Sequence, residues 1–230
     1  MLVTGHDDAR RVLLGREFLP AVGAALDRDV LECRVSAPAE GLVSGRELAG
    51  VAGPGVVRAL ALLACHAREC ATAVKEIATG GPTPYLRGCL VEGLRLWPCE
   101  PYLHRVTGGE VDWHGTPLAG GTRIEVPVAL AGPEREFAPW YWLNTRVPAD
   151  LCSERRLDLG TAALAALLPE RGYELLGADL WPGKPLPQTL DVHRLRFAVH
   201  RVGPAVPRAA RPPVPRQREV PPAPARTPRP

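Results

Sequence analysis

The stretch that decides the fold runs from Thr83 to Ala131 and reads TPYLRGCLVEGLRLWPCEPYLHRVTGGEVDWHGTPLAGGTRIEVPVALA. Its first part predicts a helix with Thr83 as N-cap and Pro84 in the first turn, where a missing N–H costs nothing. Pro98 ends this helix, because the residue before a proline is biased away from the helical region. Between these limits apolar residues recur at helical spacing and give one stripe: Tyr85, Leu86, Cys89, Leu90, Leu94 and Trp97.

Short strands are expected in the second part of the stretch. Residues 103–107 and 111–113 predict two strands with Gly108-Gly109 as the turn between them. A third run, over residues 122–128, alternates polar and apolar side chains. The stretch therefore predicts one helix followed by a small sheet.

One acid–base pair in the helix is the feature that says most about the fold. Glu92 and Arg95 lie three residues apart, so they share a helix face and can pair. Alone, such a pair is most simply a solvated surface pair that stabilises a helix by roughly 0.2–0.5 kcal/mol. The sequence around the pair is more specific than the pair alone. The pair lies in Glu-Gly-Leu-Arg-Leu-Trp-Pro, Arg105 follows ten residues after Arg95, and Gly-Thr-Arg-Ile opens the last strand.

This combination resembles the K helix and following strands of the cytochrome P-450 superfamily. In that family the glutamate and arginine of the K helix lock to an arginine from a later loop. The resemblance implies that Glu92 and Arg95 form such a structural lock. Its third member would be Arg135 or, as the alternative, Arg146. An arginine in the strand after the helix binds a haem propionate in the family, which implies Arg105 as a haem-binding residue.

The segment before the helix adds to the resemblance. LVTGHDDARRVLLGREFLP, residues 2–20, is similar to the first strand and B helix of bacterial P-450s. Residues 44–79 give the longest apolar helical pattern, which begins with a capping box of Ser44 and Glu47 and resembles the I helix. Pro54 must kink or break it. A J helix is expected over residues 68–78.

The oxygen-handling side chains of the family are missing from the I-like segment. The family carries an acid and an alcohol at the distortion, and these deliver protons to bound oxygen. This chain reads Ala-Gly-Pro-Gly-Val over residues 52–56, so Val56 replaces the alcohol and no carboxylate stands beside it. Nearby, His66 and Cys70 lie four residues apart and could share a helix face, but a metal site needs more ligands. They are interpreted as a buried thiol beside a polar histidine.

Cys152 is the candidate haem ligand, because it precedes an apolar helix predicted over residues 157–168. In the family, glycines around the cysteine let backbone N–H groups turn toward the thiolate, and this tunes the iron. The family's signature positions hold four other residues here: Thr145, Pro148, Asp150 and Glu154. Glu154 beside a thiolate would raise its pKa by like-charge repulsion. Upstream, Trp140-Tyr141-Trp142 is interpreted as a group of core or interface aromatics.

Length and composition restrict the number of domains and the class of protein. The chain has 230 residues, 46% hydrophobic and 23% charged, which is enough for one core and a tail. We expect no membrane span, no signal peptide, and six reduced cysteines in a cytoplasmic protein. Residues 203–230 hold ten of the 26 prolines and six arginines against Glu219, a charge of +5 within a total of +3. They predict a disordered tail, while the remaining body, at −2, shows no nucleic-acid footprint.

The predicted fold is α+β and mainly helical: a partial cytochrome P-450 fold with B-, I-, J-, K- and L-like helices and a small mixed sheet, lacking helices C to H. Residues 1–202 would form this P-450-like domain and residues 203–230 a disordered Pro/Arg-rich tail. The resemblance implies a non-catalytic auxiliary or activator partner of a biosynthetic enzyme such as a glycosyltransferase, with no cofactor. The alternative is a haem-thiolate monooxygenase served by a redox partner, in which Cys152 ligates iron. A product of gene decay is the third interpretation.

Overall fold

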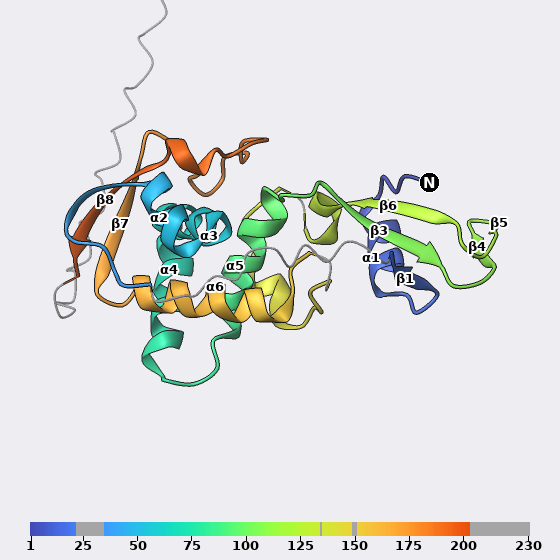
Figure 1. Ribbon diagram of the computed structural model, residues 1–230, viewed down its shortest axis with the longest axis horizontal. Coiled ribbons are helices and arrows are strands. Elements are labelled where there is room, and N and C mark those ends of the chain that lie inside the picture. The colour runs from blue at the N-terminus through green and yellow to red at the C-terminus, as the bar shows by residue number, and fades with distance from the viewer. Residues whose placement is uncertain (22–34, 134, 149–150, 203–230) are drawn as a thin grey trace, which may run out of the picture.

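The computed structural model describes residues 1–21, 35–133, 135–148 and 151–202. A helical body carries one three-stranded sheet on its side, and a second sheet extends away from the end of α5 with α1 beside it (Figure 1). The elements follow in this order: α1 His6–Leu14, β1 Phe18–Pro20, β2 Gly41–Ser44, α2 Gly45–Ala52, α3 Pro54–Cys65, α4 Ala67–Ala78, α5 Pro84–Leu96, β3 Tyr102–Thr107, β4 Val111–Trp113, β5 Thr116–Leu118, β6 Arg123–Pro127, η1 Val128–Ala131, η2 Pro139–Leu143, α6 Glu154–Leu167, β7 Arg171–Leu176, η3 Val192–Arg194 and β8 Arg196–Arg201.

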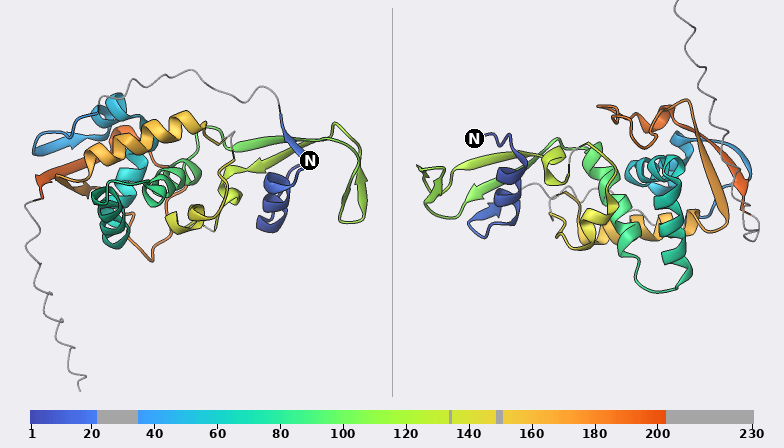
Figure 2. Two further views of the ribbon diagram at one scale, coloured as in Figure 1. Left: turned by 90° about the horizontal axis from the view of Figure 1, so that it is seen from below. Right: turned by 180° about the vertical axis from the view of Figure 1, so that it is seen from behind.

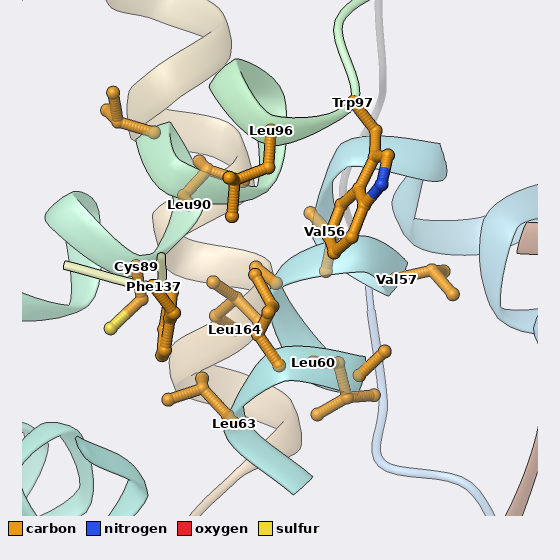
Figure 3. Close-up of a cluster of buried hydrophobic side chains, with 14 of the residues drawn as sticks. Val56, Val57, Leu60, Leu63, Cys89, Leu90, Leu96, Trp97, Phe137 and Leu164 are labelled. Carbon is orange, nitrogen blue, oxygen red and sulfur yellow. The ribbon is translucent and has the colours of Figure 1, made fainter. Parts of the chain in front are cut away.

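Helix α5 has the limits that its two prolines predict. Pro84 occupies the first turn, with Thr83 as the N-cap, and Trp97 is the C-cap before Pro98. The helix packs against α3, α6 and η2, so it is buried on several sides. Leu90 and Leu96 of α5 belong to the same buried cluster as Leu60 of α3 (Figure 3). Burying a leucine of this kind contributes about 1.5–3 kcal/mol.

The pattern over residues 44–79 was predicted as a helix kinked or broken at Pro54 with a J helix behind it, and it forms three helices with the break at Gly53-Pro54. The predicted capping box at the start of α2 is confirmed, since the Glu47 amide donates to Ser44 Oγ at 3.2 Å and the Ser44 amide donates to Glu47 Oε2 at 2.9 Å. Gly53 separates α2 from α3 at φ 84°, a conformation that favours glycine, and Pro54 begins the next helix. The J-like helix is confirmed as α4.

The predicted hairpin around Gly108-Gly109 is wrong, although both of its strands exist. Strand β3 pairs antiparallel with β1 and β6, whereas β4 pairs with β5. The turn that closes the β4–β5 hairpin is His114-Gly115, with φ values of 51° and 81°. Two residues with positive φ match the twist of the flanking strands, which explains the tight hairpin. Figure 2 shows this hairpin at the far end of the molecule from the helical body.

The sheets are antiparallel rather than mixed. The described residues form a β1-β3-β6 sheet, a β2-β8-β7 sheet and the β4-β5 pair, and the parallel contact is an isolated bridge between Leu2 and Glu125. Helix α6 begins at Glu154, earlier than predicted, because Ser153 caps it by accepting from the Arg156 amide. The predicted tail over residues 203–230 lies outside the described residues, and the lack of helices C to H stays a prediction.

Two expectations from composition concern membrane-spanning helices and the cysteines. None of the helices described here combines the length and apolar character needed to cross a bilayer. The five cysteines within the described ranges are free thiols. The sixth, Cys33, lies outside those ranges.

Candidate functional site

The centre of the helical body holds a buried ion pair. The side chains of Glu92 and Arg95 are both 0% exposed. Arg95 Nε donates to Glu92 Oε1 at 2.7 Å, and Arg95 Nη2 donates to Glu92 Oε2 at 2.9 Å. This bidentate geometry is the strongest form of arginine–carboxylate pairing. The surface-pair interpretation is therefore wrong, because the pair is buried, and the bond between Glu92 and Arg95 is consistent with the structural lock that the resemblance implied.

Two further donors form hydrogen bonds to the Glu92 carboxylate. The Ala138 amide donates to Oε2 at 2.9 Å, and the Trp142 indole Nε1 donates to Oε1 at 2.7 Å. Each carboxylate oxygen thus accepts two hydrogen bonds. A buried carboxylate keeps its charge at an acceptable cost only when it is paired and hydrogen-bonded in this way.

The Arg95 guanidinium fixes the loop that follows the second sheet. Its Nη1 donates to the carbonyl oxygens of Ala129 at 3.2 Å and Pro133 at 2.9 Å, and its Nη2 donates to the Glu136 carbonyl at 3.0 Å. Side chains of α5 therefore hold the backbone at Ala129, Pro133, Glu136 and Ala138 from inside. We call Glu92, Arg95 and Trp142 the α5 lock.

The third member of the lock was predicted to be Arg135 or Arg146, and this stays a prediction, because in the described ranges neither side chain is hydrogen-bonded to Glu92. Arg135 donates to the Pro187 carbonyl at 2.6 Å, and its Nε has no hydrogen-bond partner in the part of the chain that the structure describes. Burial, and then the positive charge of Arg95, lower the pKa of the Arg135 guanidinium. Arg146 is exposed. Trp142 is a hydrogen-bond partner of Glu92 that the sequence indicated only as one of three neighbouring aromatics.

The two predicted haem-binding residues are not joined by a contact in the described ranges. Arg105 is 3% exposed on β3, where its Nη1 donates to the His104 carbonyl at 3.0 Å. Cys152 lies half-buried just before α6. Burial is the main cause that raises the pKa of its thiol. Four nearby ionisable groups also shift this pKa: Arg156, Arg87, Glu154 and Cys99. Arg105 is not among them.

The packing of α3 against α6 tests whether haem fits. If Cys152 ligated iron and oxygen were bound near Val56, the haem would lie between these two positions. Val56 is 3% exposed, and its Cγ2 lies 3.5 Å from the place where a Cβ on Gly160 of α6 would stand. Leu90 Cδ2 lies 2.6 Å from the same place. The α3, α5 and α6 side chains are interdigitated here (Figure 3), so the residues present do not fit a haem.

The pair of His66 and Cys70 does not form a metal site either. His66 is the N-cap of α4 rather than a residue within one helix, and its Nδ1 lies 2.8 Å from the Leu62 carbonyl. Burial raises the pKa of the Cys70 thiol. In the ranges the structure describes, no three His, Cys, Asp or Glu residues are grouped so that they could hold a metal ion.

The short helix η2 presents an apolar surface. Its Trp142 points inward to the lock and is 7% exposed, whereas Trp140 is 58% exposed and Leu143 is 43% exposed. The Pro139 carbonyl approaches α5 so closely that a Cβ on Gly88 would lie 2.5 Å from it. The backbone of η2 is thus fixed from inside while two large apolar side chains face solvent. We call Trp140 and Leu143 the η2 patch.

Comparison with known proteins shows a distant likeness among solved structures. No protein-family model matches the chain, and no curated protein matches it. Among solved structures, the chain is similar to the crystal structure of a cytochrome P450 (CYP102L1), with a TM-score of 0.45 and 21% sequence identity over 67% of this chain. The match covers 43% of that protein, so this chain spans less than half its length. A TM-score of this size carries no argument, and membership of the cytochrome P-450 superfamily is therefore a proposal.

Proposed function

We propose that this protein is a haem-free relative of the cytochrome P-450 superfamily that acts as a non-catalytic auxiliary partner of a biosynthetic enzyme such as a glycosyltransferase. The observation that carries the proposal is the η2 patch. Trp142 is held by Glu92 in the interior, and two residues earlier Trp140 is 58% exposed. Large exposed aromatics on a rigid backbone are the residues that dominate protein–protein binding.

The closed interior supports the non-catalytic part of the proposal. Val56 stands where the family has an oxygen-handling alcohol, and it packs against Gly160 of α6 and Leu90 of α5. The haem-thiolate monooxygenase, with Arg105 on a propionate, would require this packing to open.

The test pairs the purified protein with a purified biosynthetic glycosyltransferase from the same organism. The initial rate of the glycosyltransferase is measured with and without the purified protein over a range of protein concentrations. We expect the wild-type protein to raise the rate. The variant W140S/L143S should need a concentration about 30-fold higher for the same effect, because hot-spot aromatics contribute about 2 kcal/mol or more.

The matched control is Leu42→Ser, which removes a side chain that is 73% exposed on β2, a strand of the β2-β8-β7 sheet. This variant should activate like the wild type. An unchanged transferase rate with the wild-type protein overturns the proposal, as does equal activation by W140S/L143S and wild type.

A further inference from the structure

A small pocket lies at the junction of α3 and α4. It has a volume of about 160 Å³ and is bounded by residues from three segments of the chain. Its lining includes six side chains with aromatic or ionisable groups: His66, Glu69, Glu136, Phe137, Trp181 and Lys184. At about 30 Å³ per water molecule, the volume equals that of about five waters. Since pockets for drug-sized ligands have roughly 300–1,000 Å³, this one suits a single side-chain-sized group.

His66 gives the pocket a hydrogen-bond acceptor. It is 7% exposed, and its ring packs edge-on to Phe137 at a centroid distance of 4.9 Å. Its Nδ1 lies 2.8 Å from the Leu62 carbonyl. A carbonyl oxygen only accepts, so Nδ1 carries the proton and Nε2 of the neutral ring bears a lone pair. In the described part of the chain Nε2 has no hydrogen-bond partner, and it is the ring nitrogen left to face the pocket.

The charges around the pocket favour a cation. Glu69 of α4 and Glu136 before η2 contribute two carboxylates, and neither forms an ion pair with another residue in the described ranges. Lys184 is the basic residue in the lining, and it pairs with Asp179. With this lysine neutralised, the two glutamates set the sign of the local potential.

We propose that this pocket binds a guanidinium group. Two carboxylates and one imidazole acceptor match a planar cation with five N–H donors. Phe137 and the indole of Trp181 supply aromatic surface, and a guanidinium stacks on such surfaces more readily than an ammonium does. The cation can come from a free guanidino compound or from an arginine side chain of a protein. The inference does not depend on the proposed auxiliary function.

Calorimetric titration of the full-length chain with three probes tests this. Agmatine represents a free guanidino compound, and N-acetyl-arginine amide represents a protein side chain. N-acetyl-citrulline amide has nearly the same shape but carries a neutral urea. We expect saturable binding of at least one guanidinium probe at one site, and binding of the citrulline probe at least about tenfold weaker, since hydrogen bonds to charged groups contribute roughly 1.5–3 kcal/mol.

Variants locate the site. Glu69→Gln and Glu136→Gln should each weaken guanidinium binding about tenfold, whereas Glu174→Gln, an exposed change on β7, should leave it unchanged. Circular dichroism confirms that each variant is folded. Tighter binding of agmatine indicates a free compound as ligand, and tighter binding of the arginine amide indicates a protein side chain. Equal binding of the citrulline probe, no binding of either guanidinium probe, or full binding by E69Q/E136Q overturns the proposal.

Discussion

The indole Nε1 of Trp142 donates to Glu92 Oε1 at 2.7 Å, across fifty positions of sequence, and both side chains are buried. This contact joins α5 to η2. It also explains why the Glu92 carboxylate is stable in the interior, because a fourth donor completes its hydrogen bonds.

Replacing Trp142 by phenylalanine should destabilise the protein by about 1–3 kcal/mol, because it leaves one buried acceptor of Glu92 without its donor. Urea unfolding followed by circular dichroism measures the free energy of unfolding. Trp140→Phe is the matched control and should change stability by less than about 0.5 kcal/mol, since Trp140 is 58% exposed. Similar losses in both variants would mean that the hydrogen bond contributes nothing specific.

Arg95→Lys should be a severe change although it keeps the charge. Lysine cannot reproduce the bidentate pair with Glu92 or the simultaneous bonds to the carbonyls of Pro133 and Glu136. Breaking a buried pair typically costs 3–5 kcal/mol, so we expect a loss of about 3 kcal/mol in urea unfolding. Arg194→Lys, in an exposed pair with Asp191, should be nearly neutral. A stable Arg95→Lys protein would contradict the importance of the fork geometry.

Gly93→Ala tests the close approach of α5 to α3. A Cβ on Gly93 would lie 2.9 Å from the backbone nitrogen of Ala59, which cannot move without shifting α3. Overpacking of this kind should lower the free energy of unfolding by about 1–3 kcal/mol. Gly50→Ala on α2 is the control, because nothing lies within 4 Å of the new methyl. It should stabilise the protein by about 0.5–1 kcal/mol through helix propensity, and the same sign for both variants would refute the packing argument.

Stability should fall in strongly alkaline solution because of Tyr173. Burial raises the pKa of Tyr173 from 10.0 to about 12, and its hydroxyl donates to the Leu167 carbonyl at 3.1 Å. Its contribution is fully present below pH 10, where the unfolded phenol is still neutral, and is lost as pH rises toward about 12. Tyr173→Phe should flatten the fall measured by urea unfolding across this window.

Tyr85, whose pKa burial also raises to about 12, should contribute a second part of the same fall. Tyr102→Phe removes the hydroxyl of a tyrosine that is 40% exposed, and it serves as the control for the substitution itself. A Tyr173→Phe protein that loses stability with pH as steeply as the wild type would contradict this assignment.

The closed α3–α6 interface predicts no haem. Protein expressed with a haem precursor should be folded and show no Soret band, oxidised or reduced under carbon monoxide, because Val56 and Leu90 fill the space beside Gly160. Cys152→Ala should leave the spectrum unchanged. A thiolate-type shift in the wild type that disappears in Cys152→Ala would establish iron ligation and the monooxygenase alternative.

Local signals in the sequence determined several elements of this protein. Pro84 and Pro98 set the limits of α5, because each acts on the backbone of its immediate neighbours. The capping box of Ser44 and Glu47 begins α2 within one turn. The helical spacing of Glu92 and Arg95 also predicted that they share a face. In each case the physical cause lies within a few residues of its effect.

Tertiary structure alone decided which side chains are buried and which distant elements contact each other. Whether the Glu92–Arg95 pair is exposed or buried depends on α3, α6 and η2 packing around α5. That Trp142 completes the lock, and that β3 pairs with β1 and β6 rather than β4, depends on contacts between residues far apart in the chain. Sequence shows that Val56 lacks an alcohol, but only the packing of α3 on α6 shows that no space for a haem lies beside it. Spacing along a chain fixes neighbours within a helix, whereas burial and long-range hydrogen bonds are set by which elements meet.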